Sequence, residues 1–489
     1  MNNSPLWHPC TQMQHHDATP VLRINQAKGA YLYLDHPLDQ SGSDQNQSSQ
    51  NQLHHNLHQG QPILDAISSW WVNLHGHSHP LINAAIRQQL EQFEHVILAG
   101  FSHQPIETLA QRLVDLTPAP LTRCFFADSG SAAVEVALKM SLQFWSQTTE
   151  SRPLESPRRN TFISLQHGYH GETLGSLSVT DIPLFSSQYR PLLIQHLKAP
   201  SPDLSLKAAD QSDDDYIKQC LNAMQQLLEH HQDQVCAVII EPLVQGAAGM
   251  KMYPASYLTG LRQLCNQYNV HLILDEIAVG FGRTGTLFAH EQAGICPDFL
   301  CLSKGLTAGY LPMSCVMTTN EVYQAFYSPD VAKGFLHSHS FTGNPLAASA
   351  ALASLDIFAH EQTLVNNQQL AQVMQQQLQQ LVDHPYISHI RQTGMIVAFD
   401  VVQVQGKPYT PEPQRMRMIS QLALKNGLLI RPIGNHVYFI PPYCIKPEEI
   451  KYMFATTVQA IEQVMSASQA TSSVQVPATY NPSDEPFLA

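Results

Sequence analysis

The sequence of 489 residues predicts an α/β fold, in which a large domain with a mainly parallel sheet is joined to a smaller α+β domain. Two observations lead to this prediction. Short runs of consecutive apolar residues, such as VCAVIIEP and NVHLILDEI, recur between residues 123 and 304 and are typical of strands buried on both faces. Helical stretches such as SYLTGLRQLCNQY separate several of these runs, as a parallel sheet requires. At roughly 100–200 residues per domain, the length suggests two or three domains.

The order of these patterns predicts a division of the chain into four regions. These are an N-terminal segment (1–69) that packs with the small domain, the large domain (70–343), the small domain (344–465) and a flexible tail (466–489). The small domain is expected to begin with a long helix from about Asn344, followed by a Gln-rich helix over residues 361–383. Ser, Thr, Pro and Ala dominate the last region, which is why we expect it to be a flexible tail.

Residues 36–61 stand out within the first region. They consist of Gln, Asn, Ser and His with almost nothing to bury, so they cannot offset the entropy that ordering would cost. An alternating segment, GAYLYLD, precedes them, and PILDAISSWW follows. We therefore expect a disordered insertion that lengthens a hairpin turn.

Charge and cysteine usage limit the class of protein. A net charge of −13 argues against a nucleic-acid surface, which needs clustered Lys and Arg. The start of the chain, MNNSPLWHPC, lacks the features of a signal peptide, and no apolar run approaches the length of a membrane span. The nine cysteines contain no CxxC pair and fit reduced thiols. We expect a cytoplasmic enzyme that binds neither nucleic acid nor membrane and carries no metal.

Candidate functional residues lie at the ends of the apolar runs, where the chemistry of α/β sheets gathers. In the segment 128–131, Asp-Ser-Gly-Ser opens a helix, so the backbone N–H groups of Gly130 and Ser131 can bind an anion such as phosphate. An ordinary helix N-cap is the alternative. Asp275 ends HLILD, where a buried acid needs a cationic partner such as a protonated pyridinium nitrogen. A structural ion pair would also meet that need.

Lys304 and Tyr169 extend this set. Lys304 ends the run LCLSK before a Gly-containing turn, which makes it a candidate for Schiff-base formation, although a lysine at the protein surface is the alternative. Tyr169, in HGYHG, can stack on a cofactor ring. Together with Asp275 and the helix start, these residues supply the parts that pyridoxal phosphate requires. Arg431, in LLIRPIGN, can bind a substrate carboxylate or form a structural salt bridge.

The segment ILDEIAVGFGRTG and the later SKGLTAG resemble the class III pyridoxal-phosphate aminotransferases of fold type I. The resemblance runs from about residue 5 to about residue 462, apart from the insertions. Within this class it is closest to the aminotransferases that convert 8-amino-7-oxononanoate to 7,8-diaminononanoate in biotin biosynthesis. This closer likeness rests on segments such as LWHPCTQM, ISSWWVNLHGHSHP, QHGYHGET and LIRPIGNHVYFIPPY.

The resemblance implies a role for each matching residue at the cofactor. Lys304 would be the catalytic lysine that binds pyridoxal phosphate covalently, and Asp275 would hold the pyridine nitrogen protonated. The backbone at Gly130 and Ser131 would bind the phosphate. Ser340 stands where the family has a Thr that reaches the phosphate of the neighbouring subunit, so a homodimer with shared active sites is implied.

The resemblance also implies a substrate site. Tyr169 and Trp70 would line the substrate channel, and Arg431 would receive a substrate carboxylate. Ser338 replaces a family Gly, which alters the substrate contact of that loop. Glu241 matches a family position but is given no role.

One departure leaves the amino donor open. The family segment reads Trp-His-Pro-Tyr, with the Tyr contacting substrate, whereas this chain has Cys10 at that position. S-adenosylmethionine is the expected donor and lysine the alternative. A second alternative is a class III aminotransferase for ω-amino acids or diamines, which the tandem Trp and the IRPIGN segment disfavour. A third is a non-catalytic binding protein, which an intact set of Lys304, Asp275 and Tyr169 disfavours.

Overall fold

The fold is known from a computed structural model that describes residues 5–14, 21–35, 60, 62–148, 159–403 and 413–471. The insertion expected at 36–61 lies outside the described residues except for Gly60. The tail is expected from residue 466, but residues 466–471 belong to the last helix, and the rest of the expected tail lies outside the described residues. The strands on either side of the insertion, β2 (Tyr31–Leu34) and β3 (Pro62–Asp65), pair antiparallel, as the hairpin prediction requires. No described helix is both long enough and apolar enough to cross a membrane.

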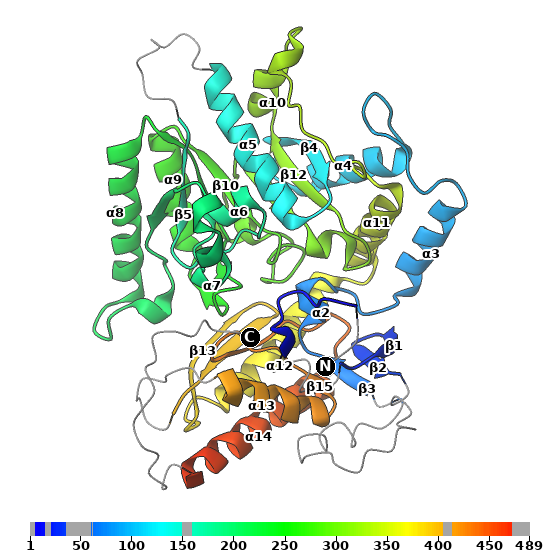
Figure 1. The fold of residues 1–489 in the computed structure, drawn as a ribbon, viewed down its shortest axis with the longest axis vertical. Helices are drawn as coiled ribbons and strands as arrows, with labels where there is room; N and C mark the ends of the chain where they lie inside the picture. The colour runs from blue at the N-terminus through cyan, green and yellow to red at the C-terminus, as the bar shows by residue number, and fades with distance from the viewer. Residues whose placement is uncertain are drawn as a thin grey trace.

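A seven-stranded sheet forms the centre of the upper part of the molecule (Figure 1). In spatial order its strands are β4 (Leu121–Ala127), β12 (Ser314–Thr319), β11 (Phe299–Leu302), β10 (His271–Asp275), β7 (Val235–Ile240), β5 (Thr161–Leu165) and β6 (Leu197–Ala199). Neighbours from β11 to β6 pair in parallel, whereas β12 runs antiparallel to both β11 and β4. The prediction of a mainly parallel sheet is therefore confirmed. Every residue of β7 and β10 is buried, which explains their unbroken apolar sequences.

Helices cover this sheet. The helix α5 (Gly130–Thr148) packs against five of its strands and begins directly beyond the carboxyl end of β4. The other helices and 3-10 turns of this part are α6 (Leu174–Val179), α7 (Pro183–Ser186), η2 (Ser187–Leu192), η3 (Leu204–Leu206), α8 (Asp213–His231), α9 (Ala255–Gln267), η4 (Ala289–Ala293), η5 (Lys304–Thr307), α10 (Asn320–Phe326) and η6 (Val331–Lys333). A short hairpin of β8 (Val244–Gln245) and β9 (Lys251–Met252) follows β7.

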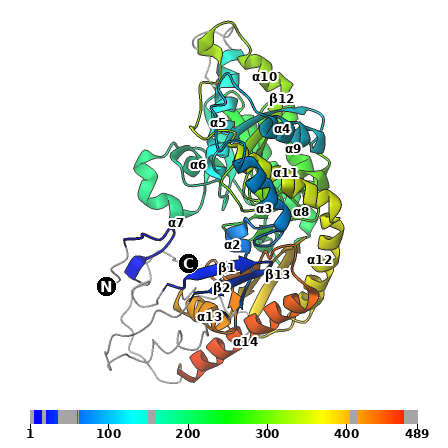
Figure 2. The ribbon, with the colours of Figure 1, turned by 90° about the vertical axis from the view of Figure 1, so that its right-hand side faces the viewer.

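The lower part of the molecule combines the first strands and the last helices of the described chain (Figures 1 and 2). The first strands, β1 (Ile24–Lys28), β2 and β3, form a sheet with β15 (Leu428–Leu429), which pairs in parallel with β3. A second antiparallel sheet joins β13 (Ile387–Thr393), β14 (Ile396–Val401) and β16 (His436–Phe439). The accompanying helices are α12 (Thr363–Gln379), α13 (Pro413–Lys425) and α14 (Pro447–Thr471). The helix α12 confirms the Gln-rich helix; the domain limits drawn from the sequence stay a prediction.

Three helices and one short turn belong to the segments of the chain that connect the upper and lower parts of the molecule. The helices α3 (Pro80–Leu90) and α4 (Gln104–Leu116) both pack on α11 (Pro345–His360), the long helix expected from Asn344. The Asn344 side chain caps this helix by accepting a hydrogen bond from the Ala347 N–H at 3.0 Å. Just before α3, the turn α2 (Ser68–Trp71) lies between the upper and lower parts (Figures 1 and 2).

Candidate active site

Two parallel strands bring the proposed lysine and carboxylate together. Asp275 is the last residue of β10, and Lys304 begins η5 just beyond the end of β11, which pairs in parallel with β10. Burial lowers the pKa of Lys304, while the neighbouring carboxylates of Asp275 and Glu241 oppose that shift. Lys304 has a left-handed backbone with φ of 40°, which is uncommon for a residue with a side chain and typical of functional sites.

A histidine that the sequence did not single out holds the Asp275 carboxylate. The His170 ring nitrogen Nδ1 lies 2.8 Å from the Asp275 Oδ2, and the Ile277 N–H donates to Oδ1 at 3.2 Å. His170 and Asp275 are only 2% and 5% exposed. A buried carboxylate requires such donors. The sequence alone could not identify this contact, because His170 and Asp275 are 105 residues apart in the chain.

The start of α5 forms the anion-binding end of the site. The Glu172 N–H donates to the Ser131 hydroxyl oxygen at 3.1 Å, which ties the HGYHG segment to the helix start. Gly171 has a φ of 121°, and a Cβ placed there would come within 2.1 Å of the Ser131 Oγ. Only glycine therefore lets the backbone approach this closely. Gly130 and Ser131 present the first N–H groups of the helix, which have no partner within it.

Glu241, which has no role assigned from the sequence, connects the backbone at Tyr169 to the backbone at Gly246. It is 5% exposed and accepts hydrogen bonds from the Tyr169 N–H at 2.8 Å and the Gly246 N–H at 2.9 Å. Burial, together with the charge of Asp275, raises the pKa of Glu241 to about 8. The raised pKa favours the protonated form of this carboxyl group.

Tyr169 stands at the edge of this group. Its hydroxyl donates to the Glu172 Oε1 at 2.9 Å, and its ring meets the Phe185 ring edge-on at 5.4 Å between centroids. Burial and the Glu172 carboxylate both raise the pKa of the Tyr169 phenol, which therefore keeps its proton. The side chain can thus donate a hydrogen bond and offer an aromatic face at neutral pH.

These residues enclose a cavity of ≈ 180 Å³. Its lining consists of Trp71, Ser129, Gly130, Ser131, Tyr169, His170, Gly171, Glu241, Asp275, Ile277, Ala278, Val279 and Lys304. The structure thus brings together five of the residues proposed from the sequence, namely Gly130, Ser131, Tyr169, Asp275 and Lys304.

The remaining proposed residues lie elsewhere. Trp71, rather than Trp70, lines the cavity, and the Lys304 Nζ is 5.0 Å from the centre of the Trp71 ring. Trp70 is 41% exposed and lies against Arg431, whose guanidinium carbon is 4.7 Å from the ring centre. Arg431 also donates to the Cys10 carbonyl oxygen at 3.3 Å. These contacts bring the N-terminal segment and Arg431 together near Trp70, and their contact with substrate stays a prediction.

The loop that carries Ser338 and Ser340 is exposed. The Ser340 carbonyl oxygen accepts from the His95 Nε2 at 2.8 Å, and neither serine is among the residues that line the cavity. Ser340 is expected to contact the phosphate in the neighbouring subunit. The structure of one chain does not test this contact, which stays a prediction.

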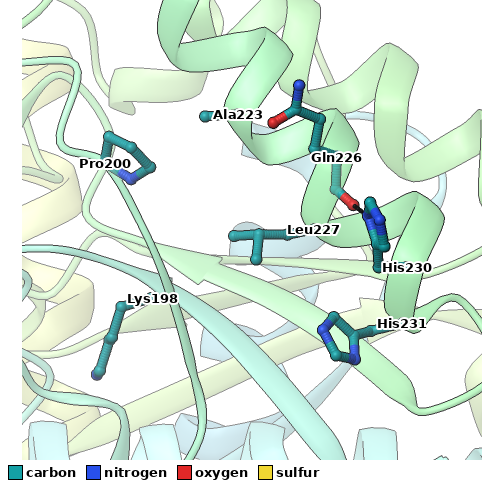
Figure 3. A pocket seen from close by; sticks show the side chains of 7 residues that line it. All are labelled: Lys198, Pro200, Ala223, Gln226, Leu227, His230 and His231. Carbon is teal, nitrogen blue, oxygen red and sulfur yellow. Dashed lines mark hydrogen bonds between the residues drawn. The ribbon is translucent and has the colours of Figure 1, made fainter.

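A separate hollow lies between β6 and α8 and is lined by none of the proposed site residues (Figure 3). Lys198 lines it, but its ammonium group donates to the Ser164 Oγ and to the Val179 and Thr180 carbonyl oxygens at 2.8–3.1 Å. A lysine held by three acceptors has no donor left for a ligand. Lys198 therefore offers no free donor to a ligand in this hollow.

Comparison with known proteins agrees with the geometry. The family model for the class III aminotransferases matches residues 46–461. Among curated proteins, an adenosylmethionine-8-amino-7-oxononanoate aminotransferase of Helicobacter pylori is 43% identical over 465 residues, covering 94% of this chain and 96% of the relative. The enzyme of the same name from Synechococcus elongatus is 40% identical over 94% of this chain and 99% of its own length.

Solved structures give the same result. The adenosylmethionine-8-amino-7-oxononanoate aminotransferase of Methanocaldococcus jannaschii superimposes with a TM-score of 0.82 at 34% identity, covering 94% of this chain and 97% of the other. An amine transaminase from an uncultivated Pseudomonas species, solved in its PLP-bound form, gives a TM-score of 0.84 at 28% identity, covering 94% of this chain and 99% of the other. The family model, these relatives and the cavity at the strand ends agree, and the chain belongs to the class III aminotransferases.

Proposed function

We propose that this protein is a pyridoxal-phosphate-dependent aminotransferase that transfers an amino group from S-adenosylmethionine to 8-amino-7-oxononanoate and so forms 7,8-diaminononanoate in biotin biosynthesis. The cavity that joins Lys304 and Asp275 to the start of α5 is the observation that carries the proposal. The relatives that match nearly the whole chain bear the name of this reaction.

The residues of the cavity fit the cofactor. Asp275 is a buried carboxylate held by the His170 ring, and it can balance a protonated pyridine nitrogen. A Cβ at Gly171 would fill the space beside Ser131, where the N-terminus of α5 can receive the phosphate. When bound, pyridoxal phosphate supplies an electron sink for the carbanion that forms at the substrate. Lys304 would be its covalent attachment point.

The same residues would move the proton. The lowered pKa of Lys304 favours the neutral amine, the form that would take up a proton at its Nζ from the substrate Cα. Trp71 covers the Lys304 Nζ from one side and excludes water there. The protonated Glu241 can donate a hydrogen bond without adding a second negative charge beside Asp275.

A second group of residues would select the substrates. The Arg431 guanidinium can form a fork with the carboxylate of the amino acceptor. The exposed ring of Trp70 and the phenol of Tyr169 offer apolar faces for its aliphatic chain and for an adenosyl group. Cys10 brings a backbone carbonyl, not a phenol, to Arg431, so the N-terminal contact with the donor differs from the one that the family resemblance implies.

The amino donor can be tested by single half-reactions. We expect that S-adenosylmethionine, added without an acceptor, converts the bound cofactor to its amino form and removes the absorbance of the lysine-bound form. Lysine at the same concentration is expected to react more slowly. Stopped-flow absorbance measures both rates, and added 8-amino-7-oxononanoate should restore the original spectrum. Faster conversion by lysine would reassign the donor, and conversion only by a simple ω-amine would replace the proposal with an ω-amine aminotransferase.

We further propose that the protein is a cytoplasmic homodimer. Several large apolar side chains are exposed close to the loop of Ser338 and Ser340, including Ile97 at 61%, Phe101 at 69% and Phe341 at 63%. Such a patch favours a protein–protein contact. We expect sedimentation velocity to show a dimer, and Phe101→Asp to shift it to a monomer because a carboxylate would be buried at the contact. A wild-type monomer at micromolar concentration would contradict the proposal.

A further inference from the structure

Trp70 and Trp71 lie in a left-handed turn. Ser68, Ser69, Trp70 and Trp71 have φ angles of 51°, 46°, 73° and 72°, so four successive residues are left-handed and none of them is glycine. This conformation is unfavourable for a residue with a side chain, because the Cβ comes too close to the following carbonyl oxygen. Strain of this kind persists only where the surrounding structure fixes it, and it collects at functional sites.

The turn directs its two indoles to two basic side chains. The Trp71 ring enters the cavity and lies 5.0 Å from the Lys304 Nζ, while the Trp70 ring lies 4.7 Å from the Arg431 guanidinium carbon. The first contact is at the proposed reacting amine and the second at the proposed carboxylate site. The contact of Arg431 with Trp70 is a cation–π geometry. One four-residue turn therefore sets the position of an aromatic face at each end of the substrate path.

A single buried carboxylate supports this turn. Asp65 ends β3 and is 0% exposed. Its Oδ1 accepts from the Ile67 N–H at 3.2 Å, directly before the turn. Its Oδ2 accepts from the Ser69 hydroxyl at 2.7 Å, inside the turn. The same oxygen lies 3.0 Å from the His77 Nε2, beyond the turn. Asp65 thus bonds to the chain before, within and after the left-handed residues.

The hydrogen bonds around Asp65 determine the charge of its side chain. The Gly76 N–H donates to the Asn73 Oδ1 at 2.8 Å, which leaves the Asn73 Nδ2 to donate to the His77 Nδ1 at 3.0 Å. His77 is then a neutral ring whose Nε2–H donates to Asp65. Burial raises the pKa of Asp65, but the hydrogen bonds from His77 and Ser69 outweigh it and lower the pKa overall. Asp65 is therefore an anion that neutral donors hold.

We propose that Asp65 is a positioning residue of the aminotransferase reaction, whose carboxylate holds the left-handed turn Ser68–Trp71 so that Trp71 covers Lys304 and Trp70 lies on Arg431. Asp65 lines neither the cavity nor the proposed carboxylate site, so it acts through the two indoles. The inference rests on the proposed function, because it assigns Asp65 a part in that reaction.

The test is Asp65→Asn. An asparagine has the same shape, but it is uncharged and its NH2 group is a donor. It therefore cannot accept the hydrogen bonds from Ile67, Ser69 and His77 at the same time. We expect kcat/KM to fall by about 10–100-fold, since a misplacement of about 1 Å near the reacting groups has effects of that size. In the cofactor-free protein, the emission of Trp71, assigned by its loss in Trp71→Phe, should become more accessible to acrylamide.

Two controls separate positioning from stability. His77→Gln keeps an N–H donor that can face Asp65 and should retain most activity, whereas His77→Leu should reproduce Asp65→Asn. Asp400→Asn removes another buried carboxylate, 7% exposed and bonded to His436 and Arg391 in the β13–β14–β16 sheet. This variant should lower the Tm without changing the Trp71 emission or kcat/KM.

The outcomes decide the proposal. A lowered Tm for Asp65→Asn with unchanged Trp71 emission and unchanged kcat/KM would overturn it and leave Asp65 a purely structural residue. A wild-type protein that transfers no amino group would instead contradict the proposed function. In that case the acrylamide measurement on the cofactor-free protein would still show whether Asp65 holds the turn.

Discussion

Lys304→Ala is expected to lower kcat by at least about 10⁴-fold. The variant loses both the covalent attachment of the cofactor and the amine that would move the proton, and positioned proton transfer alone contributes about 10²–10⁴-fold. The cavity and the start of α5 stay intact, so we expect the variant still to bind pyridoxal phosphate non-covalently. Steady-state rates and equilibrium dialysis with pyridoxal phosphate measure the two effects separately.

A second buried lysine provides the matched control. Burial lowers the pKa of Lys198 to about 8, yet its ammonium group is held by neutral oxygens outside the proposed site. Lys198→Met should lower the Tm and leave the cofactor in place. Borohydride reduction of the wild-type holoenzyme, followed by peptide mapping, should find the label on Lys304. A label on Lys198, or on any other lysine, would overturn the assignment of the reacting amine.

The sequence predicts the positions of Lys304 and Asp275 because the strands of the central sheet can be recognised from short apolar segments. Strands buried on both faces need unbroken apolar runs, and parallel strands place their carboxyl ends at one edge. The register of β10 with β11 then brings the two residues to the same cavity. This part of the fold and of the site follows from patterns of about ten residues, without any long-range information.

Other parts of the site depend on contacts that no local pattern contains. Trp70 and Trp71 are equivalent in the sequence, and their different environments come from a left-handed turn that ordinary backbone preferences disfavour. His170 meets Asp275 only because β5 and β10 flank β7 in the sheet. Likewise, Glu241 gains its role from the bonds to Tyr169 and Gly246. Sequence reasoning assigned Trp70 to the channel and could not have preferred Trp71.

Asp275→Asn is expected to lower kcat/KM by about 10²–10³-fold, the loss that follows removal of one preorganised electrostatic contact to a developing charge. An amide cannot stabilise a protonated pyridine nitrogen as a carboxylate can, so the ring would withdraw electrons less strongly. The absorbance of the bound cofactor should change as well. The neighbouring Glu276 is the control, since its carboxylate bonds to Ala289 and His290 and not to the cavity. Glu276→Gln should lower the Tm without that spectral change.

A double-mutant cycle then tests whether His170 acts through Asp275. His170→Leu removes the donor 2.8 Å from the carboxylate and should cost about tenfold in kcat/KM, whereas His170→Asn can still place an N–H near Oδ2 and should cost less. If His170 only orients and stabilises the Asp275 charge, His170→Leu has no further effect once Asp275 is Asn, so the two losses are not additive. Additive losses would instead give His170 an independent contact with the cofactor or the substrate, through the Nε2 that has no hydrogen-bond partner among the described residues.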